Sequence, residues 1–169
     1  MEKSQLRQAN GQDLIHMEEI FQLIFEENRK SLMAYKEREE LKAEIVNGQA
    51  FLLFLDEILV GYCSYKIWQS CIEIMSLVLR AKYRQRGYGF TLCYYVVNLA
   101  KELWPDKLIL ALPNDNSVGI LQKCGFVEFP KVELPDELRQ SCAGCLEYND
   151  FPDCHCQTLR LPGKIKTMK

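Results

Sequence analysis

Hydrophobic positions follow a helical spacing near the start of the chain. Apolar residues recur every three or four positions from Leu14 to Phe25, as on the buried face of a helix. Asn10 and Asp13, just before this run, have the residue types of a helix N-terminus. The pattern predicts a first helix here and a second from Lys36 to Val46, which ends at Asn47-Gly48.

The middle of the chain carries short runs of apolar, β-branched and aromatic residues separated by turn residues, which predict an antiparallel meander of three strands. A later apolar run without internal Pro predicts a long helix that ends before Pro105. The expected strands are 5–9, 50–55, 58–68, 71–79, 107–112, 126–132 and 155–161, and the later helices are 88–103 and 116–123. The predicted order is strand, two helices, three strands, helix, strand, helix, two strands.

Composition is that of an ordinary globular protein. The chain has 169 residues, of which 48% are hydrophobic and 26% charged, so we expect a single domain over residues 1–169. The net charge of −2 argues against general nucleic-acid binding, which favours a basic excess. The apolar runs are too short to span a bilayer and the first residues do not resemble a secretory signal, so we expect a cytoplasmic protein that is not held in a membrane.

A glycine-containing turn connects the third strand of the meander to the long helix. Arg84-Gln85-Arg86-Gly87-Tyr88-Gly89 stands at a helix start, where N–H groups have no partner within the helix. Such groups, with the helix dipole, suit a pyrophosphate, and the two arginines can add charged hydrogen bonds. Taken alone, the same residues also fit a solvated surface turn.

Two motifs together resemble the GNAT N-acetyltransferase superfamily. Arg84-x-x-Gly87-x-Gly89 fits the Arg/Gln-x-x-Gly-x-Gly/Ala signature of that family. Downstream, the segment from Asn114 to Phe126 resembles the Asn-x-x-Ala…Lys-x-Gly-Phe segment, with Ser117 in place of Ala. The resemblance covers about residues 5–134 and implies an α+β fold: a mixed central sheet with a splayed pair of parallel strands, flanked by helices.

The resemblance also implies where acetyl-CoA binds. The strand ending at Leu79 and the strand 107–112 should run parallel and separate at their ends, with the pantetheine arm between them. Backbone N–H groups from Gln85 to Phe90 should hold the pyrophosphate. The implied cofactor-binding residues are Leu77, Val78, Leu79, Arg84, Gln85, Arg86, Gly87, Tyr88, Gly89, Phe90, Asn114 and Lys123.

Glu73 is the candidate general base. Acetyl transfer needs a neutral amine, so a base must take a proton from the ammonium form. Glu73 lies on the strand that leads to the glycine turn, near the position that serves as base in the histone-acetyltransferase-like branch of the family. The alternative is a solvent-facing residue of a half-buried strand. The tyrosine that the family often uses as proton donor is replaced here by Leu121, so Tyr62, Tyr65 or a water would have to substitute.

Four of the eight cysteines crowd one late segment. Cys142, Cys145, Cys154 and Cys156 lie within fifteen residues and suit a tetrahedral zinc site. An iron–sulfur cluster, a redox pair or four free thiols are the alternatives. We therefore predict that residues 135–156 form a cysteine-rich, metal-binding insertion with structural zinc.

The predicted function is transfer of an acetyl group from acetyl-CoA to a primary amine of a small molecule or a protein, by a monomer or a homodimer. The alternative is a CoA-binding module without catalysis, which would use a zinc-stapled lobe to recognise a partner. No motif identifies the acceptor amine.

Overall fold

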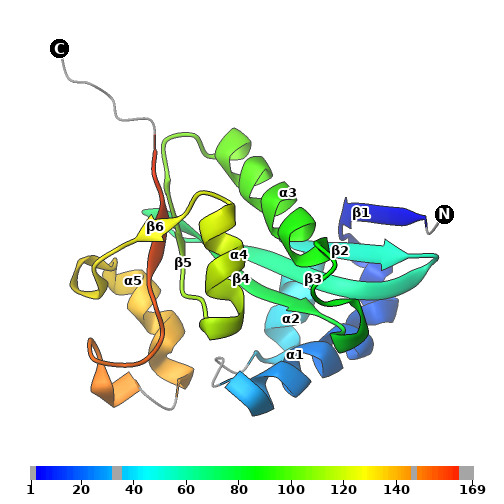
Figure 1. Ribbon diagram of the computed structural model, residues 1–169, viewed down its shortest axis with the longest axis horizontal. Coiled ribbons are helices and arrows are strands. Elements are labelled where there is room, and N and C mark those ends of the chain that lie inside the picture. Colours follow the sequence, from blue (N-terminus) through cyan, green and yellow to red (C-terminus); the bar gives the residue numbers. More distant parts are fainter. Residues whose placement is uncertain (1–2, 32–35, 146–147, 164–169) are drawn as a thin grey trace.

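The computed structural model describes residues 3–31, 36–145 and 148–163 of the 169-residue chain. These residues form one mixed sheet with strand order β1-β2-β3-β4-β5-β7-β6, flanked by helices on its two faces (Figure 1). The predicted α+β class is confirmed, and the predicted order of helices and strands agrees except that the structure adds a short helix, Asp136–Arg139, between the last two strands.

Most element boundaries agree with the predicted ones to within one or two residues. The strands are β1 Ser4–Gln8, β2 Ala50–Leu55, β3 Ile58–Ile67, β4 Cys71–Leu79, β5 Leu108–Ala111, β6 Val127–Glu128 and β7 Leu159–Leu161. The α-helices are α1 Met17–Ser31, α2 Arg38–Val46, α3 Tyr88–Leu103, α4 Asp115–Lys123 and α5 Asp136–Arg139. Short 3₁₀ turns precede α1 and α3 and recur in the late segment, at Gly11–His16, Ala81–Tyr83, Lys131–Glu133, Gln140–Gly144 and Tyr148–Asp150.

Asn10 begins the first helical segment, as its residue type predicts. Its side chain accepts a hydrogen bond from the N–H of Gln12, and Asp13 accepts one in return from the N–H of Asn10. Arg7 of β1 adds a two-pronged ion pair to Asp13, with distances of 2.6 and 2.8 Å. This contact lowers the pKa of Asp13, and it joins the first strand to the helix start.

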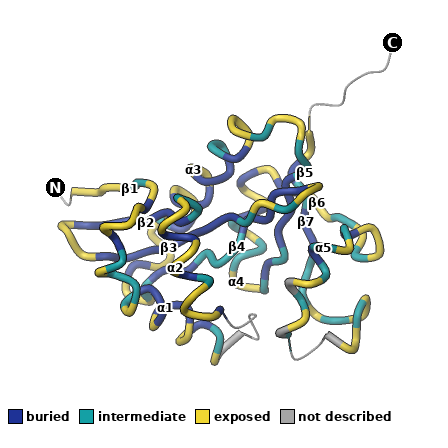
Figure 2. The backbone as a smooth tube through the Cα atoms, turned by 180° about the vertical axis from the view of Figure 1, so that it is seen from behind, coloured by how far each residue is buried: buried dark blue, intermediate teal, exposed yellow. Residues whose placement is uncertain are grey.

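Helices cover both faces of the central strands, which is why β2 is buried along its whole length. Successive side chains of a strand point to opposite faces. Phe51 and Leu53 pack with buried residues of α3, whereas Leu52 and Phe54 pack with buried residues of α1 and α2. Figure 2 shows this buried backbone in dark blue at the centre of the molecule. Among the described residues, no helix is both long and apolar enough to cross a bilayer.

β5 pairs along its whole length with only the first four residues of β4. The two strands are parallel, and the register joins Cys71–Ile74 to Leu108–Ala111. The second half of β4, from Met75 onward, has no partner in β5. This confirms the predicted splayed pair of parallel strands. The edge of β4 that faces β5 is therefore unpaired from Met75 to Leu79.

Residues 129–145 and 148–158, here called the lobe, connect β6 to β7. Leu134 and Leu138 of the lobe are buried against Cys71 of β4 and Leu110 of β5. The predicted strand over 126–132 is wrong beyond Glu128, because Pro130 lacks an N–H and a 3₁₀ turn begins there. The predicted strand over 155–161 is likewise shorter, since only Leu159–Leu161 pairs, between β5 and β6.

Candidate active site

A bulge distorts β4 at the point where it leaves β5. β4 carries two residues, Ser76 and Leu77, between the partners of Tyr62 and Ser64, where β3 has one residue. Ser76 accordingly has a left-handed backbone, with φ of 56°. A bulge leaves backbone groups outside the ladder and redirects them. Leu77 is half-buried at this bulge, while Val78 and Leu79 are buried just beyond it.

The glycine turn Arg84–Gly87 connects β4 to α3 through two left-handed residues. Gln85 has φ of 60° and Gly87 has φ of 86°. Gly87 caps α3 without a side-chain hydrogen bond, and a Cβ placed on it would meet no atom within 4 Å. The turn therefore presents the start of a 16-residue helix to open space. Left-handed turns and helix starts both orient N–H groups toward a bound anion.

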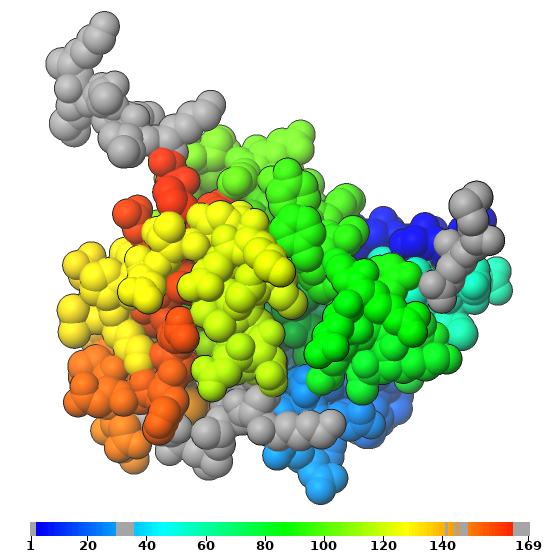
Figure 3. All heavy atoms as spheres, in the orientation of Figure 1, coloured from blue at the N-terminus to red at the C-terminus, as the bar shows by residue number. Residues whose placement is uncertain are grey.

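Gly89 serves packing. A Cβ at this position would lie 3.0 Å from Cδ1 of Ile120 in α4 and 3.3 Å from Cδ1 of Leu79. The absent side chain thus lets α3 approach both β4 and α4. Figure 3 shows the result on one face, where the region around the turn (green) and α4 (yellow) lie side by side.

The side chain of Arg84 is 39% exposed, but its guanidinium is engaged by two groups of the protein. Its Nε and Nη2 donate to the carbonyl of Leu79 at 3.0 and 2.9 Å, and Nη2 contacts Oε2 of the buried Glu27 at 2.7 Å. The guanidinium therefore joins the end of β4 to α1. Arg86 is also exposed and lies next to the ring of Tyr83, and the predicted contact of the two arginines to phosphate stays a prediction.

The remaining predicted cofactor contacts lie on α3 and α4. Asn114 is the N-cap of α4, and its Oδ1 accepts from the N–H groups of Asn116 and Ser117 at 3.0 and 3.1 Å. Phe90 is exposed on the first turn of α3 and stacks on Tyr94. Tyr88 is half-buried at the start of α3, and Lys123 is exposed in the last turn of α4.

Glu73 is buried, with 4% of its surface exposed. Within the sheet it pairs with Lys66 of β3 and Leu110 of β5, and Nε1 of Trp68 donates to its Oε2 at 3.0 Å. The solvent-facing alternative is therefore wrong. Glu73 lies three residues before Ser76, about 10 Å along an extended strand.

The lobe lies beside Glu73. Glu137 of α5 accepts hydrogen bonds from the N–H groups of Gln69 and Ser70, at 2.9 and 2.7 Å, in the turn between β3 and β4. Hydrogen bonds from Ser70 lower the pKa of Glu137. Burial raises the pKa of Cys142 to about 11, with the carboxylate of Glu73 as a further cause. These contacts place the lobe against the amino-terminal half of β4.

The four lobe cysteines are half-buried and reduced. Sγ of Cys154 and Sγ of Cys156 are 3.7 Å apart, and Nζ of Lys131 is 3.6 Å from Sγ of Cys154. Burial raises the pKa of Cys156 to about 12. In the part of the chain that the structure describes, no three potential ligands gather closely enough to hold a metal ion. As arranged, these thiols do not fit a zinc ion, so the predicted metal site gains no support.

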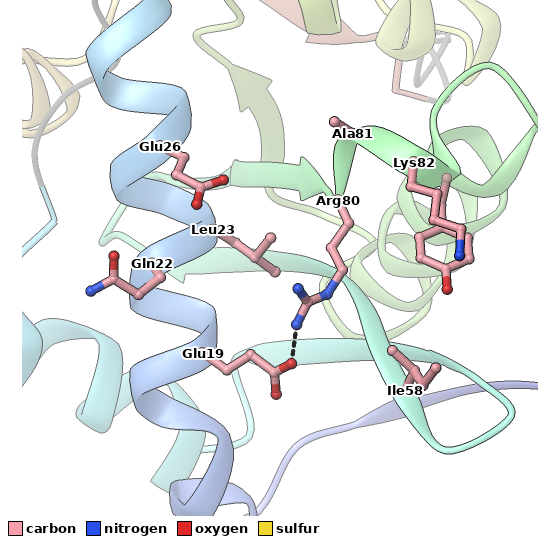
Figure 4. A pocket seen from close by; sticks show the side chains of 9 residues that line it. Glu19, Gln22, Leu23, Glu26, Ile58, Arg80, Ala81 and Lys82 are labelled. Carbon is pink, nitrogen blue, oxygen red and sulfur yellow. Dashed lines mark hydrogen bonds and ion pairs between the residues drawn. The ribbon is translucent and has the colours of Figure 1, made fainter.

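A surface cavity of about 540 Å³ lies on the other flank of β4, between α1 and the segment that precedes the glycine turn (Figure 4). An ion pair between Arg80 and Glu19 crosses it. Its lining includes no residue of β5 or α4, so it is separate from the opening between the splayed strands. The residues that line it are Glu19, Gln22, Leu23, Glu26, Ile58, Arg80, Ala81, Lys82 and Tyr83.

A cluster of buried polar residues on the α1/α2 side of the bulge was not expected from the sequence. Lys36, Glu44 and Ser64 are each at most 4% exposed, and Tyr62 is fully buried. One signal was available, because Glu44 stands beside Ile45 on the apolar side of α2. Leu121, at the position where a tyrosine was sought, is buried in the apolar core.

Sequence comparison identifies one family. The pattern of the Acetyltransferase (GNAT) family matches residues 14–126, which include the bulge, the glycine turn and α4. Comparison with the sequences of curated proteins gives no match.

Solved structures share the fold. N-acetylglutamate synthase from Neisseria gonorrhoeae, complexed with coenzyme A and N-acetyl-glutamate, superposes with a TM-score of 0.73 at 23% identity. The match covers 94% of this chain and only 35% of that one. PaiA N-acetyltransferase from Thermoplasma acidophilum, in complex with coenzyme A, gives 0.66 at 17%, with 94% and 98% covered. The ribosomal-protein-S18-alanine N-acetyltransferase from Escherichia coli gives 0.62 at 11%, with 95% and 94% covered.

Proposed function

This chain belongs to the GNAT acetyltransferase family, and we propose that it transfers the acetyl group of acetyl-CoA to a primary amine of a small molecule or a protein. One observation carries the proposal: an open strand edge, a bulge and a left-handed glycine turn follow one another along β4 and the start of α3. Structurally similar proteins include an N-acetylglutamate synthase and a PaiA N-acetyltransferase, each complexed with coenzyme A.

The glycine turn fits a diphosphate. The space beside Gly87 is open, and its φ of 86° is costly for any residue with a Cβ. We therefore assign the backbone N–H groups from Gln85 to Phe90 to the pyrophosphate of acetyl-CoA. Backbone groups of Leu77 and Leu79 would pair with the pantetheine amides, because β5 does not occupy that edge of β4.

Glu73 and the bulge would perform the chemistry. Glu73 takes one proton from the acceptor ammonium, which frees the nitrogen lone pair. When the new C–N bond forms, N–H groups at the bulge donate to the oxygen that becomes negative. The C–S bond then breaks and the sulfur leaves with the bonding electrons, while the attacking nitrogen loses its extra proton, which passes through water to that sulfur and gives a neutral amide and free thiol. With Leu121 buried, no residue of α4 is assigned to that last transfer.

Acetyl-CoA, incubated with the protein and a panel of amines and amino-terminal peptides, tests the proposal. We expect at least one acceptor to release free CoA thiol in step with formation of its N-acetyl product. Binding of CoA without turnover on any acceptor would instead support the non-catalytic module. Absence of both binding and turnover would exclude the proposed function.

A further inference from the structure

Lys36, Glu44 and Ser64 form a buried polar chain on the α1/α2 side of β3. Nζ of Lys36 lies 2.5 Å from Oε1 of Glu44, and the two side chains are 4% and 5% exposed. The hydroxyl of Tyr62 donates to the other oxygen of Glu44. The ammonium also lies 5.7 Å from the centre of the Tyr62 ring. Each of the two charges therefore has several close partners inside the protein.

This chain ends on the backbone of β4 at the bulge. Nζ of Lys36 donates to Oγ of Ser64 at 3.4 Å, and Oγ of Ser64 donates to the carbonyl of Met75 at 3.5 Å. Sγ of Cys63 lies 3.7 Å from the same carbonyl. Met75 immediately precedes Ser76, the left-handed residue of the bulge. The buried charges are thus connected to the residue at which β4 departs from regular pairing.

Stability alone is a poor explanation for these charges. Removing two charges from water costs several kcal/mol per ion, and well-packed apolar residues in place of a buried ion pair are often neutral or stabilising. The neighbouring residues of the same face, such as Leu41 and Ile45, already form an apolar core. What an apolar replacement lacks is a directional contact to the Met75 carbonyl through Ser64.

We propose that Lys36, Glu44 and Ser64 are positioning residues that hold the β4 bulge in the geometry needed to receive the thioester carbonyl. The inference rests on the proposed function, and it names the residues that set the geometry of the β4 bulge at the site of that function. They do not touch the reacting atoms; they act through the backbone between Met75 and Leu77. A misplacement of about 1 Å can cost roughly 100-fold in rate, so a loosened bulge lowers kcat while the glycine turn still binds CoA.

Two variants test the contact. Ser64→Ala removes the hydroxyl that connects Lys36 to Met75. The triple variant Lys36→Met/Glu44→Leu/Tyr62→Phe removes both charges and the hydroxyl that would lose its acceptor. For both we expect kcat to fall about 10-fold or more, with the dissociation constant for CoA within about twofold of wild type. The triple variant should keep or raise the melting temperature, which a merely structural role would not allow.

Arg7→Met is the matched control. It breaks the ion pair with the buried Asp13, and β1, which carries Arg7, is separated from β4 by β2 and β3 in the sheet. We expect a lower melting temperature and an unchanged kcat, which separates loss of stability from loss of positioning. Unchanged kcat in the folded Ser64→Ala and triple variants would overturn the proposal.

Backbone hydrogen exchange gives a readout that needs no acceptor. Exchange at Ser76 and Leu77 should accelerate in Ser64→Ala and stay at the wild-type rate in Arg7→Met. If it accelerates while the wild type acetylates no amine, the positioning role stands and the proposed function fails. If exchange at the bulge is unaltered, the positioning role fails whatever the activity of the wild type.

Discussion

The two halves of β4 are organised by different parts of the chain. The carboxyl-terminal half contains the bulge and leads within ten residues into the glycine turn and α3. The amino-terminal half, with Glu73, is covered by the lobe, which lies more than fifty residues later in the sequence. The left-handed residues of the glycine turn are close neighbours in the sequence, whereas the burial of Glu73 depends on contacts between distant segments. We expect substitutions at the glycine turn to act on CoA binding, and those at Glu73 and in the lobe to act on the acceptor and the chemical step.

The largest expected effect is that of Gly87→Trp. The new side chain enters the open space beside the turn and must adopt a left-handed backbone. CoA affinity, measured by calorimetry, should fall about 100-fold or more, since the diphosphate site is occupied. Gly11→Trp, also in open space but with an ordinary φ, is the control and should retain wild-type affinity. Tight CoA binding by Gly87→Trp would contradict the assignment of the turn.

Glu73→Gln should distinguish the chemical step from CoA binding most clearly. Removing a positioned general base typically costs 10²–10⁴ in rate, so we expect kcat to fall about 100-fold, while CoA affinity changes less than about twofold. The control is Glu128→Gln on exposed β6. A kcat and pH–rate profile that match those of wild type would remove Glu73 from the mechanism.

Glu27→Gln tests the ion pair between Glu27 of α1 and Arg84 of the glycine turn. Without the carboxylate, Arg84 loses its charged partner on α1 and keeps its hydrogen bonds to the carbonyl of Leu79. Loss of a charged hydrogen bond of this kind costs roughly 1.5–3 kcal/mol. We expect CoA affinity to weaken about 10-fold, the equivalent of about 1.4 kcal/mol. Glu26→Gln, one position earlier and exposed, is the control. Equal affinity for the two variants would mean that Arg84 does not organise the turn.

Leu138→Ala should give the smallest catalytic effect. Truncating this fully buried side chain of the lobe destabilises its packing by about 2–5 kcal/mol. We expect a few-fold rise in the KM for the acceptor with unchanged CoA affinity, because the lobe borders Glu73 and not the glycine turn. Val132→Ala, exposed in the same lobe, is the control. Weakened CoA binding in Leu138→Ala would contradict the assignment of the lobe to the acceptor side and of the glycine turn to CoA.

The same contrast explains what the sequence could predict. Asn10, Gly87 and the strand-turn patterns act on neighbouring residues, so the helix start, the meander and the glycine turn were all foreseeable. The burial of Glu73 was not, because it depends on Trp68 and on a lobe that packs from far along the chain.

Contacts between distant segments also account for the other features that the sequence did not predict. Nothing in the three residues of β7 indicates that they insert between β5 and β6. Lys36 and Glu44 reach Ser64 and Tyr62 because α2 packs over β3. Arg84 has the residue type of a phosphate ligand, yet a buried carboxylate on α1 engages it first. The contact that Arg84 makes therefore depends on a distant helix, which its position in the motif does not indicate.

The central claim is that backbone N–H groups at the turn from Gln85 to Phe90 hold the diphosphate of CoA. Amide hydrogen exchange of the wild-type protein, with and without saturating CoA, tests it most directly. We predict that CoA slows exchange at these amides more than at the amides of β1. Equal exchange with and without CoA at this turn would contradict the claim.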